Sequence, residues 1–415
     1  MRVEYFIAKR SAAQKSGDKP SIMVRVATIS VALSVALMTI TLAIVFGFKR
    51  EVTQSITGFT SHAIMSDVAT FGGSQSDPIE DRAELRELVL EQRGALSISP
   101  YATLQGVVRS SESIEGVMLR GIDSLYDDTF LQSSLVAGDL PRSSSATESR
   151  RDLLLSESLA QRLGVGVDER LELIVSDANE TMRRYLFKVC GLYATGLEEW
   201  DRMVMLTDLE CVQRLNAWQR GQISGYEIRF SSLKEASRGC ERINDELLYG
   251  EYEGVENIVA ITTEELYPSI FDWLKAHNVN AVVVIVIMII VAGFNMATAL
   301  LILVLERTRM IGVLKSLGMN NSSLQRIFLY RALSITLKGL AWGNGVSLLI
   351  CYLQEKFHLV RLDAGSYLLN FVPIELGWGW IVGLNVAVVA TILALMTLPT
   401  RMVSKIKVEE TLKFE

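Results

Sequence analysis

The chain has 415 residues, of which 49% are hydrophobic and 21% are charged, and its formal net charge is −6. Its mean hydropathy of +0.28 is too high for an ordinary soluble enzyme, while its charge content is too high for a protein wholly inside lipid. The composition therefore predicts a few membrane spans plus a sizeable soluble domain. The negative net charge argues against nucleic acid as the main partner.

The sequence gives no sign of a metal centre or of a nucleotide-hydrolysing motif. Its four cysteines and three histidines are scattered without metal-ligand spacing, and no stretch fits the phosphate-binding pattern GxxxxGK[ST]. We therefore expect no metal, no cofactor and no ATPase in this chain. One disulfide among Cys190, Cys211 and Cys240 stays open as an alternative, because these residues would face an oxidising compartment.

Four segments are long and apolar enough to span a bilayer, which takes about 20 residues. We predict spans at 23–47, 281–305, 323–353 and 375–399. The first is longer than the apolar region of a signal peptide and lacks an A-x-A-like cleavage site, so we expect a retained anchor. In the third, snorkelling of Arg331 and Lys338 to the cytoplasmic surface is favoured over a polar pathway.

Lysine and arginine predict the orientation of these spans. They are concentrated in the N-terminal segment 1–22, in the segment 306–322 and in the tail 400–415, and they are sparse in the loop 354–374. The positive-inside rule places the basic segments and both termini in the cytoplasm. The large insert 48–280 then lies outside.

The insert is expected to be a mixed α/β domain, which makes the fold an α-helical membrane protein with such a domain between helices one and two. A helix over Ser156–Leu163 should end at Gly164. A polar loop is expected over Ser143–Ser149. Short strands are predicted at Gly116–Gly121, Leu171–Val175, Tyr185–Tyr193 and Arg202–Leu206.

Both ends of the insert are predicted to lie on helices that continue membrane spans. The first span should run on through Phe48–Ile56 and stop at Gly58, and Thr262 and Glu265 have capping-box spacing. Apolar or aromatic residues then recur every three or four positions into the second span, at Leu266, Ile270, Trp273, Leu274 and His277. Such helices could carry movement from the bilayer to the domain; the alternative is that they are merely long.

Seven stretches distributed along the chain share one resemblance. They are Gly47–Glu51 with Ile56 and Gly58, Gly121–Asp123, Leu159–Val165, the turn from Gly191 through Gly196 and Glu198 to Asp201, Phe294–Asn295, Glu306–Gly318, and Val408–Glu415. These stretches resemble the lipoprotein-releasing (Lol-type) permeases of the FtsX/MacB superfamily of ABC transporter membrane subunits. The resemblance implies a MacB-like periplasmic domain, whose size favours the Lol branch.

The resemblance also implies a function and partners. The chain would be the permease subunit of an ATP-driven transporter that releases lipoproteins from the outer leaflet of the inner membrane. It would be non-catalytic and would pair with an identical or related permease, while a separate ATPase binds ATP and Mg²⁺. The loop that holds a lipoprotein carrier in some Lol permeases is short here, at Ser176–Arg184, so carrier docking stays open. The alternatives are a MacB-like efflux permease and an FtsX-like signalling module that controls an extracytoplasmic hydrolase.

The segment 306–322 is the coupling helix that the resemblance implies. Its apolar side chains would pack into a groove of the ATPase and its cations would pair with acidic groups at the rim; the alternative is a basic loop held by anionic headgroups. The candidate coupling residues are Glu306, Arg307, Arg309, Ile311, Gly312, Val313, Leu314, Lys315, Leu317 and Gly318.

Spans one and two are the candidate walls of an apolar shelter for acyl chains. Exposing three chains of about fifteen CH₂ groups would cost roughly 35 kcal/mol, which no single contact offsets. The candidate wall residues are Leu42, Val45, Phe46, Phe48, Ile285, Met288 and Ile289. Gly339 and Gly343 have small-xxx-small spacing for helix packing, and Asn295 suits an interhelical hydrogen bond. The acidic pair Glu198 and Asp201 would serve an enzyme, but a salt-bridged turn explains it equally well.

Overall fold

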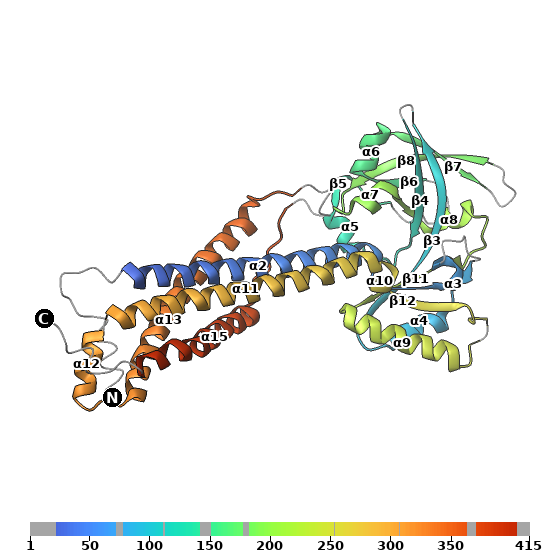
Figure 1. The fold of residues 1–415 in the computed structure, drawn as a ribbon. Coiled ribbons are helices and arrows are strands. Elements are labelled where there is room, and N and C mark those ends of the chain that lie inside the picture. Colours follow the sequence, from blue (N-terminus) through green and yellow to red (C-terminus); the bar gives the residue numbers. More distant parts are fainter. Residues whose placement is uncertain are drawn as a thin grey trace. The chain divides into compact units, whose positions relative to one another are not determined.

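The computed structural model describes residues 22–71, 78–110, 113–141, 151–176, 182–252, 254–306, 308–362 and 371–404. They belong to two compact units (Figure 1). The membrane unit comprises Met1–Arg50, Trp273–Arg361 and Val372–Glu415, and the α/β unit comprises Glu51–Asp272 and Leu362–Phe371. The predicted loop Ser143–Ser149 and the stretch Val408–Glu415 lie outside the described residues.

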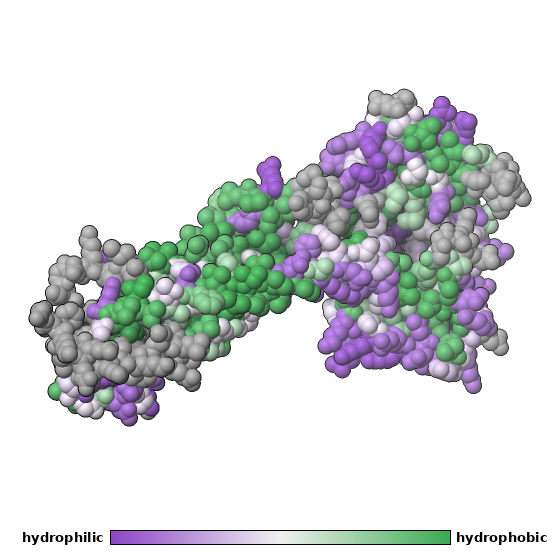
Figure 2. Space-filling model, viewed as in Figure 1, coloured by the Kyte–Doolittle hydropathy of each residue, from purple (hydrophilic) through white to green (hydrophobic). Residues whose placement is uncertain are grey.

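The membrane unit is built from long apolar helices. They are α2 (Ile22–Thr60), α11 (Pro268–Glu306), α13 (Asn321–Phe357) and α15 (Trp378–Ser404), with the short α12 (Thr308–Ser316) between the second and third. Four of the described helices are long and apolar enough to cross a membrane, which confirms the number predicted. Hydrophobic residues cover much of the visible surface of these helices (Figure 2), as expected of helices that face lipid.

Helix α2 extends further than predicted. Gly58 does not stop it, and it ends at Thr60. A Cβ atom at Gly58 would lie 2.4 to 2.9 Å from ring carbons of Phe130, so the glycine is needed for a close approach rather than for a turn. Sequence alone does not distinguish these two uses of glycine.

The capping box is present, but it begins a different helix. Thr262 N–H donates to Glu265 Oε2 (2.9 Å) and Glu265 N–H donates to Thr262 Oγ1 (3.2 Å). They cap the single turn α10 (Thr263–Leu266), which ends at Tyr267, and α11 begins at Pro268. The prediction of one helix from Thr262 onward was wrong, because a proline disfavours helical backbone at the residue before it and cannot donate a hydrogen bond.

The α/β unit contains a ten-stranded sheet and a separate two-stranded one. The order in the large sheet is β12-β1-β11-β3-β4-β9-β6-β8-β5, and β7 pairs with β3 and β8. The strands are β1 (Ala63–Asp67), β3 (Ala95–Arg109), β4 (Ile114–Ile122), β5 (Leu135–Gly138), β6 (Asp152–Ser156), β7 (Arg170–Ser176), β8 (Met182–Tyr193), β9 (Val204–Asp208), β11 (Gly225–Phe230) and β12 (Ile258–Thr262). The small sheet pairs β2 (Ile79–Glu80) with β10 (Gln222–Ile223).

Short helices cover this sheet over two separate hydrophobic cores. They are α3 (Val68–Phe71), α4 (Ala83–Leu90), α5 (Thr129–Ser133), α6 (Glu157–Leu163), α7 (Glu198–Met203), α8 (Leu209–Leu215) and α9 (Leu233–Tyr249). Met65, Phe230 and Ile243 belong to the core under α4 and α9, and Leu159, Phe187 and Met205 belong to the other. The non-sequential strand order brings β1, next to α2 in sequence, between β11 and β12.

Most local predictions in this unit are confirmed. Strands β4, β7 and β8 contain the predicted segments, and α6 begins at the capping residue Ser156 and ends at Gly164, whose φ of 65° suits glycine. The strand predicted at Arg202–Leu206 begins only at Val204, because Arg202 and Met203 complete helix α7. An i,i+4 ion pair between Glu198 and Arg202 stabilises that helix.

Candidate functional sites

The predicted coupling segment forms helix α12, and the turn after it is fixed by glycine. Gly318 has a φ of 87°, its N–H donates to Lys315 C=O (3.0 Å), and Met319 N–H donates to Leu314 C=O (3.0 Å). This pair of bonds is a Schellman motif, which ends a helix and reverses the chain. Helix α13 starts directly afterwards at Asn321.

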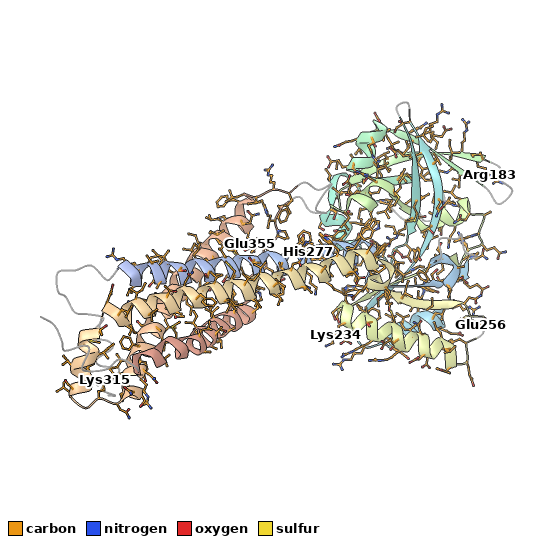
Figure 3. The ribbon with its side chains drawn as sticks, in the orientation of Figure 1. Arg183, Lys234, Glu256, His277, Lys315 and Glu355 are labelled. Carbon is orange, nitrogen blue, oxygen red and sulfur yellow. The ribbon has the colours of Figure 1, made fainter. Side chains whose placement is uncertain are left out.

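The side chains of α12 divide into an inward and an outward set. Ile311 is fully buried in the core of the membrane unit, and Leu314 packs against that core. Both were predicted to face outward into a groove of the ATPase, and neither does. Val313 and Leu317 are 46% and 78% exposed. Lys315 lies on the same short helix (Figure 3). Arg307 lies outside the described residues, and of Arg309 the backbone alone is described.

The remaining coupling candidates are backbone and boundary positions. Glu306 is exposed at the end of α11, and Gly312 is buried beside Ile311. We call Val313, the half-buried Lys315 and Leu317, which follows the last residue of α12, the outward face of this helix. Ile311 and Leu314, two of the four apolar candidates, instead hold the helix onto the bundle.

The predicted wall residues form two groups. Leu42 of α2 and Ile285, Met288 and Ile289 of α11 pack against one core in the membrane unit. Phe46 instead lies against Trp380 with ring centroids 5.6 Å apart. The half-buried Val45 stands between the two groups along α2.

Phe48 is the outermost wall residue and has aromatic partners on α11. Its ring centroid lies 5.4 Å from that of Trp273 and 6.5 Å from that of His277. The helices α2 and α11 are therefore joined by aromatic contacts at the end where both leave the membrane unit. The middle of α2 also meets the segment before α15, since Glu375 N–H donates to Ala43 C=O (3.0 Å).

Small and polar residues hold the membrane helices together. A Cβ atom at Gly339 would lie 2.7 Å from Val31 Cγ1, and one at Gly343 would lie 2.6 Å from Ala32 C=O, so α13 approaches α2 closely at both glycines. Asn295 of α11 donates to Ser30 Oγ of α2 (2.8 Å). Asn344 donates to Asn385 Oδ1 (2.9 Å) and joins α13 to α15, a pair that the sequence analysis did not single out.

Two arginines that the sequence analysis missed hold the C-terminal end of α2. Arg120 Nη1 donates to Phe59 C=O (3.0 Å) and Arg229 Nη2 donates to Gly58 C=O (3.3 Å). The last carbonyls of a helix carry partial negative charge and lack intrahelical partners, so guanidinium groups are favourable there. The two arginines tie α2 to strands β4 and β11 of the sheet.

Each of these arginines is charge-paired inside the α/β unit. Arg120 is 5% exposed and forms an ion pair with Glu227, which is 3% exposed. Arg229 pairs with Asp127 (3.0 Å). A signal did exist in β11, where the charged residues Glu227 and Arg229 alternate with apolar ones, but β4 has no such pattern, and only the strand order brings Arg120 to Glu227.

A cavity of about 310 Å³ opens beside the Arg120–Glu227 pair, within the α/β unit. Six of its lining residues are aromatic, including Phe59, Trp200 and Tyr267. Burial raises the pKa of Tyr101, which also lines the cavity, to about 12, so its hydroxyl stays protonated at physiological pH. Its lining combines these aromatic groups with polar side chains such as Thr103 and Gln105.

The acidic pair near Gly196 shapes a turn. Asp201 accepts hydrogen bonds from Thr195 Oγ1 (2.7 Å), Thr195 N–H (3.2 Å) and Gly196 N–H (3.3 Å). Burial is the largest influence on the Asp201 carboxyl and raises its pKa. Glu198 pairs with Arg202, so the structural interpretation of the two acids is sufficient.

The described residues contain no cluster of His, Cys, Asp and Glu able to hold a metal ion. All four cysteines are described and are free thiols. Cys211 and Cys240 lie in different cores of the α/β unit, which explains why they do not pair. Burial raises the pKa of Cys190 and of Cys240 to about 12, so both are unreactive at neutral pH.

Comparison with known families places both parts of the chain. Residues 26–236 match the MacB-like periplasmic core domain, and residues 282–408 match the FtsX-like permease C-terminal family. The first match alone covers just over half of the chain.

Known relatives match the chain from end to end. The lipoprotein-releasing system transmembrane protein LolC of Neisseria meningitidis serogroup B is 21% identical, with 97% of each chain covered. LolE of Haemophilus influenzae is also 21% identical, with 99% of each covered. Among solved structures, the periplasmic region of MacB from Actinobacillus actinomycetemcomitans is 15% identical and covers 51% of this chain and 92% of its own, with a TM-score of 0.34. The chain, an inner-membrane protein with four apolar helices, belongs to the MacB-like periplasmic core domain family and is a Lol-type permease of the FtsX/MacB superfamily.

Proposed function

We propose that this chain is the permease subunit of an ATP-driven ABC transporter that releases lipoproteins from the outer leaflet of the inner membrane. The end-to-end similarity to proteins named as lipoprotein-releasing transmembrane subunits carries the proposal. In this arrangement the α/β unit is periplasmic and inserted between spans one and two, and both termini are cytoplasmic. The concentration of Lys and Arg in segments 1–22, 306–322 and 400–415 supports that orientation.

The chain works with two kinds of partner. A separate ATPase binds ATP and Mg²⁺, and the outward face of α12 (Val313, Lys315 and Leu317) is the surface that meets it. A second permease, identical or related, completes the dimer. Two exposed apolar side chains around a cation suit a groove with an acidic rim, which supports this role for α12.

The permease must shield the acyl chains of the lipoprotein from water. Helices α2 and α11 supply the apolar walls, since Leu42, Ile285 and Ile289 lie together on the bundle. Each sheltered CH₂ is worth about 0.8 kcal/mol, so a wall must be continuous over many residues to hold a chain. Because α2 ends under Arg120 and Arg229 on the sheet of the α/β unit, movement of this helix is passed to the periplasmic domain.

Depletion of the protein, followed by separation of the inner and outer membranes, tests the proposal. Lipoproteins destined for the outer membrane should accumulate in the inner membrane, while integral outer-membrane proteins keep their distribution. Hypersensitivity to drugs or toxins without such accumulation would indicate efflux. Chained cells with correctly sorted lipoproteins would indicate control of a cell-wall hydrolase.

A further inference from the structure

A groove runs between α2 and α13 on the surface of the membrane unit. Its volume is about 560 Å³, and its lining is apolar except at Arg25, Thr28 and Lys338. Leu33 and Trp342, on opposite sides of the groove, are 59% and 70% exposed. The predicted cargo walls lie on α2 and α11 instead, so this groove is a separate surface of α2.

Small residues create the groove. Gly343 and Ala32 line it, and a Cβ atom at Gly343 would lie 2.6 Å from Ala32 C=O. The two backbones therefore approach closely at its floor, while the larger side chains on either side rise above it. An apolar groove with small residues at its floor leaves room for an acyl chain.

The two cations lie in a defined place along the helices. Gly339 meets Val31 and Gly343 meets Ala32, so residue numbers increase in the same direction on both helices and α2 runs parallel to α13 here. Arg25 lies in the first turn of the described part of α2, and Lys338 directly precedes Gly339. The charged end of the groove is thus the end where α2 begins, and the lining beyond it, at Leu33 and Val346, is apolar.

Both cations are exposed, and within the described residues neither forms an ion pair with a carboxylate. Two like charges that line one groove repel each other, and lipid around them would not solvate them. A bound anion relieves both costs. A ligand with one anionic group and a long apolar chain satisfies the whole groove, whereas a soluble anion would leave the apolar part empty.

We propose that this groove binds an anionic phospholipid of the inner leaflet, with the phosphate between Arg25 and Lys338 and one acyl chain lying past Leu33 and Trp342. The assignment to the inner leaflet rests on the proposed function, which places the start of α2 in the cytoplasm. Lysine and arginine at that depth attract anionic headgroups. The site lies on a different helix pair from the predicted cargo walls and, under the proposed function, in the other leaflet.

The test measures lipid that stays with the purified complex. Wild-type complex is extracted from membranes containing phosphatidylglycerol and phosphatidylethanolamine in mild detergent, and the bound phospholipid is identified by mass spectrometry. We expect phosphatidylglycerol to be enriched at about one molecule per chain. The double variant Arg25→Gln/Lys338→Gln should lose that enrichment at least five-fold, and the charge-conserving Arg25→Lys/Lys338→Arg should keep it.

A matched control is available on the same two helices. Lys49 of α2 and Lys356 of α13 are exposed cations near the opposite ends of these helices, so Lys49→Gln/Lys356→Gln removes the same charge and should keep the lipid. Equal yield and equal ATPase co-purification show that each variant is folded. Unchanged enrichment in the Arg25/Lys338 variant, or equal loss in the control, overturns the proposal.

Two further outcomes also overturn it. Photocrosslinking from position 342 to a second permease or to residues 1–21, rather than to lipid, would mean that protein fills the groove. Displacement of the bound lipid by glycerol phosphate alone would mean that the apolar channel contributes nothing. The lipid readout needs no transport, so a wild-type complex without enrichment defeats this inference and leaves lipoprotein release standing. Correct lipoprotein sorting after depletion defeats the proposed function and leaves the lipid result standing.

Discussion

At the scale of single residues, Arg120 is both half of a buried ion pair with Glu227 and a hydrogen-bond donor to the end of α2. Removing one partner of a buried ion pair leaves an uncompensated charge, whereas removing both can be nearly neutral. Here Arg120 also donates to the carbonyl of Phe59, so its loss affects the end of α2 even when the charge is balanced. Substitutions at Arg120 and Glu227 can therefore separate the effect on stability from the effect on the contact between α2 and the sheet.

We expect Glu227→Gln to destabilise the protein by about 3 kcal/mol, because Arg120 keeps its charge in a buried site without its partner. The double variant Arg120→Met/Glu227→Met should regain most of that stability and still release lipoprotein poorly, since Phe59 C=O loses its clamp. Thermal unfolding and ATP-dependent release from membrane vesicles measure the two effects. If the double variant restores release along with stability, the clamp has no mechanical role.

His62 gives the α/β unit a dependence on pH. Burial, and then the nearby Arg229, lowers its pKa from 6.5 to about 4. Between pH 6.5 and about 4, His62 is therefore protonated in the unfolded chain but neutral in the folded protein. The contribution of His62 to stability is full above that pH and is lost as the pH falls toward 4.

His62→Gln should remove this part of the pH dependence. With a discount for solvent access to a partly buried group, wild type should lose about 1–2 kcal/mol more than the variant between pH 7 and pH 5. Thermal unfolding at both pH values measures the difference. Parallel loss of stability in the two proteins would assign the acid sensitivity to other groups.

At the scale of elements, α12 offers a small outward face on a helix that is otherwise fixed to its own bundle. Ile311 and Leu314 hold it from one side, and the turn at Gly318 fixes its exit. If the proposed coupling is right, a force on Lys315 or Leu317 passes into the membrane helices through these contacts.

Reversing the charge at Arg309 and Lys315 together should uncouple the ATPase without unfolding the chain. We expect ATPase co-purification and stimulation to fall at least ten-fold, because acidic groups on the partner would then be repelled. Lys356→Glu, on an exposed cation of α13 far from α12 in sequence, is the control and should bind the ATPase normally. Normal co-purification and stimulation with the double reversal would remove the coupling role from α12.

Elements built from local sequence were predictable, and those set by distant partners were not. The apolar runs predicted the four membrane helices, and Ser156 and Gly164 predicted the two ends of α6. The break between α10 and α11 at Tyr267 was not predicted, although Pro268 marks it. The reason is that the apolar periodicity continues across the break. The Arg120–Glu227 pair depends on β4 and β11, which lie on either side of β3, and no local pattern contains that order.

In the candidate sites, too, features set by local sequence were predictable and features set by distant contacts were not. The position of α12 could be predicted from its basic, amphipathic sequence between two apolar runs. The inward turn of Ile311 could not, since it depends on contact with other helices. Likewise the glycine pair predicted close helix packing, but only the structure identifies α2 as the partner and reveals the groove beside it.

At the scale of the whole molecule, two helices contain residues of both units. Helix α2 crosses from one to the other after Arg50, and α11 crosses before Trp273. If movement travels along α2, the helix must resist bending at that boundary. If α2 and α11 are merely long, a flexible joint there should be harmless, and this difference can be measured directly.

Two glycines inserted between Arg50 and Glu51 should separate ATP hydrolysis from lipoprotein release. Two adjacent glycines weaken a helix by about 1 kcal/mol per residue and leave a hinge. Helix α2 would therefore bend instead of carrying movement to its end at Thr60. We expect normal assembly and normal ATPase activity with release reduced at least ten-fold. The same insertion after Arg220, in the exposed turn before β10, controls for the added length and should leave release unchanged. Full release with the α2 insertion would show that the continuity of this helix has no mechanical function, and the clamp at Arg120 and Arg229 would then serve stability alone.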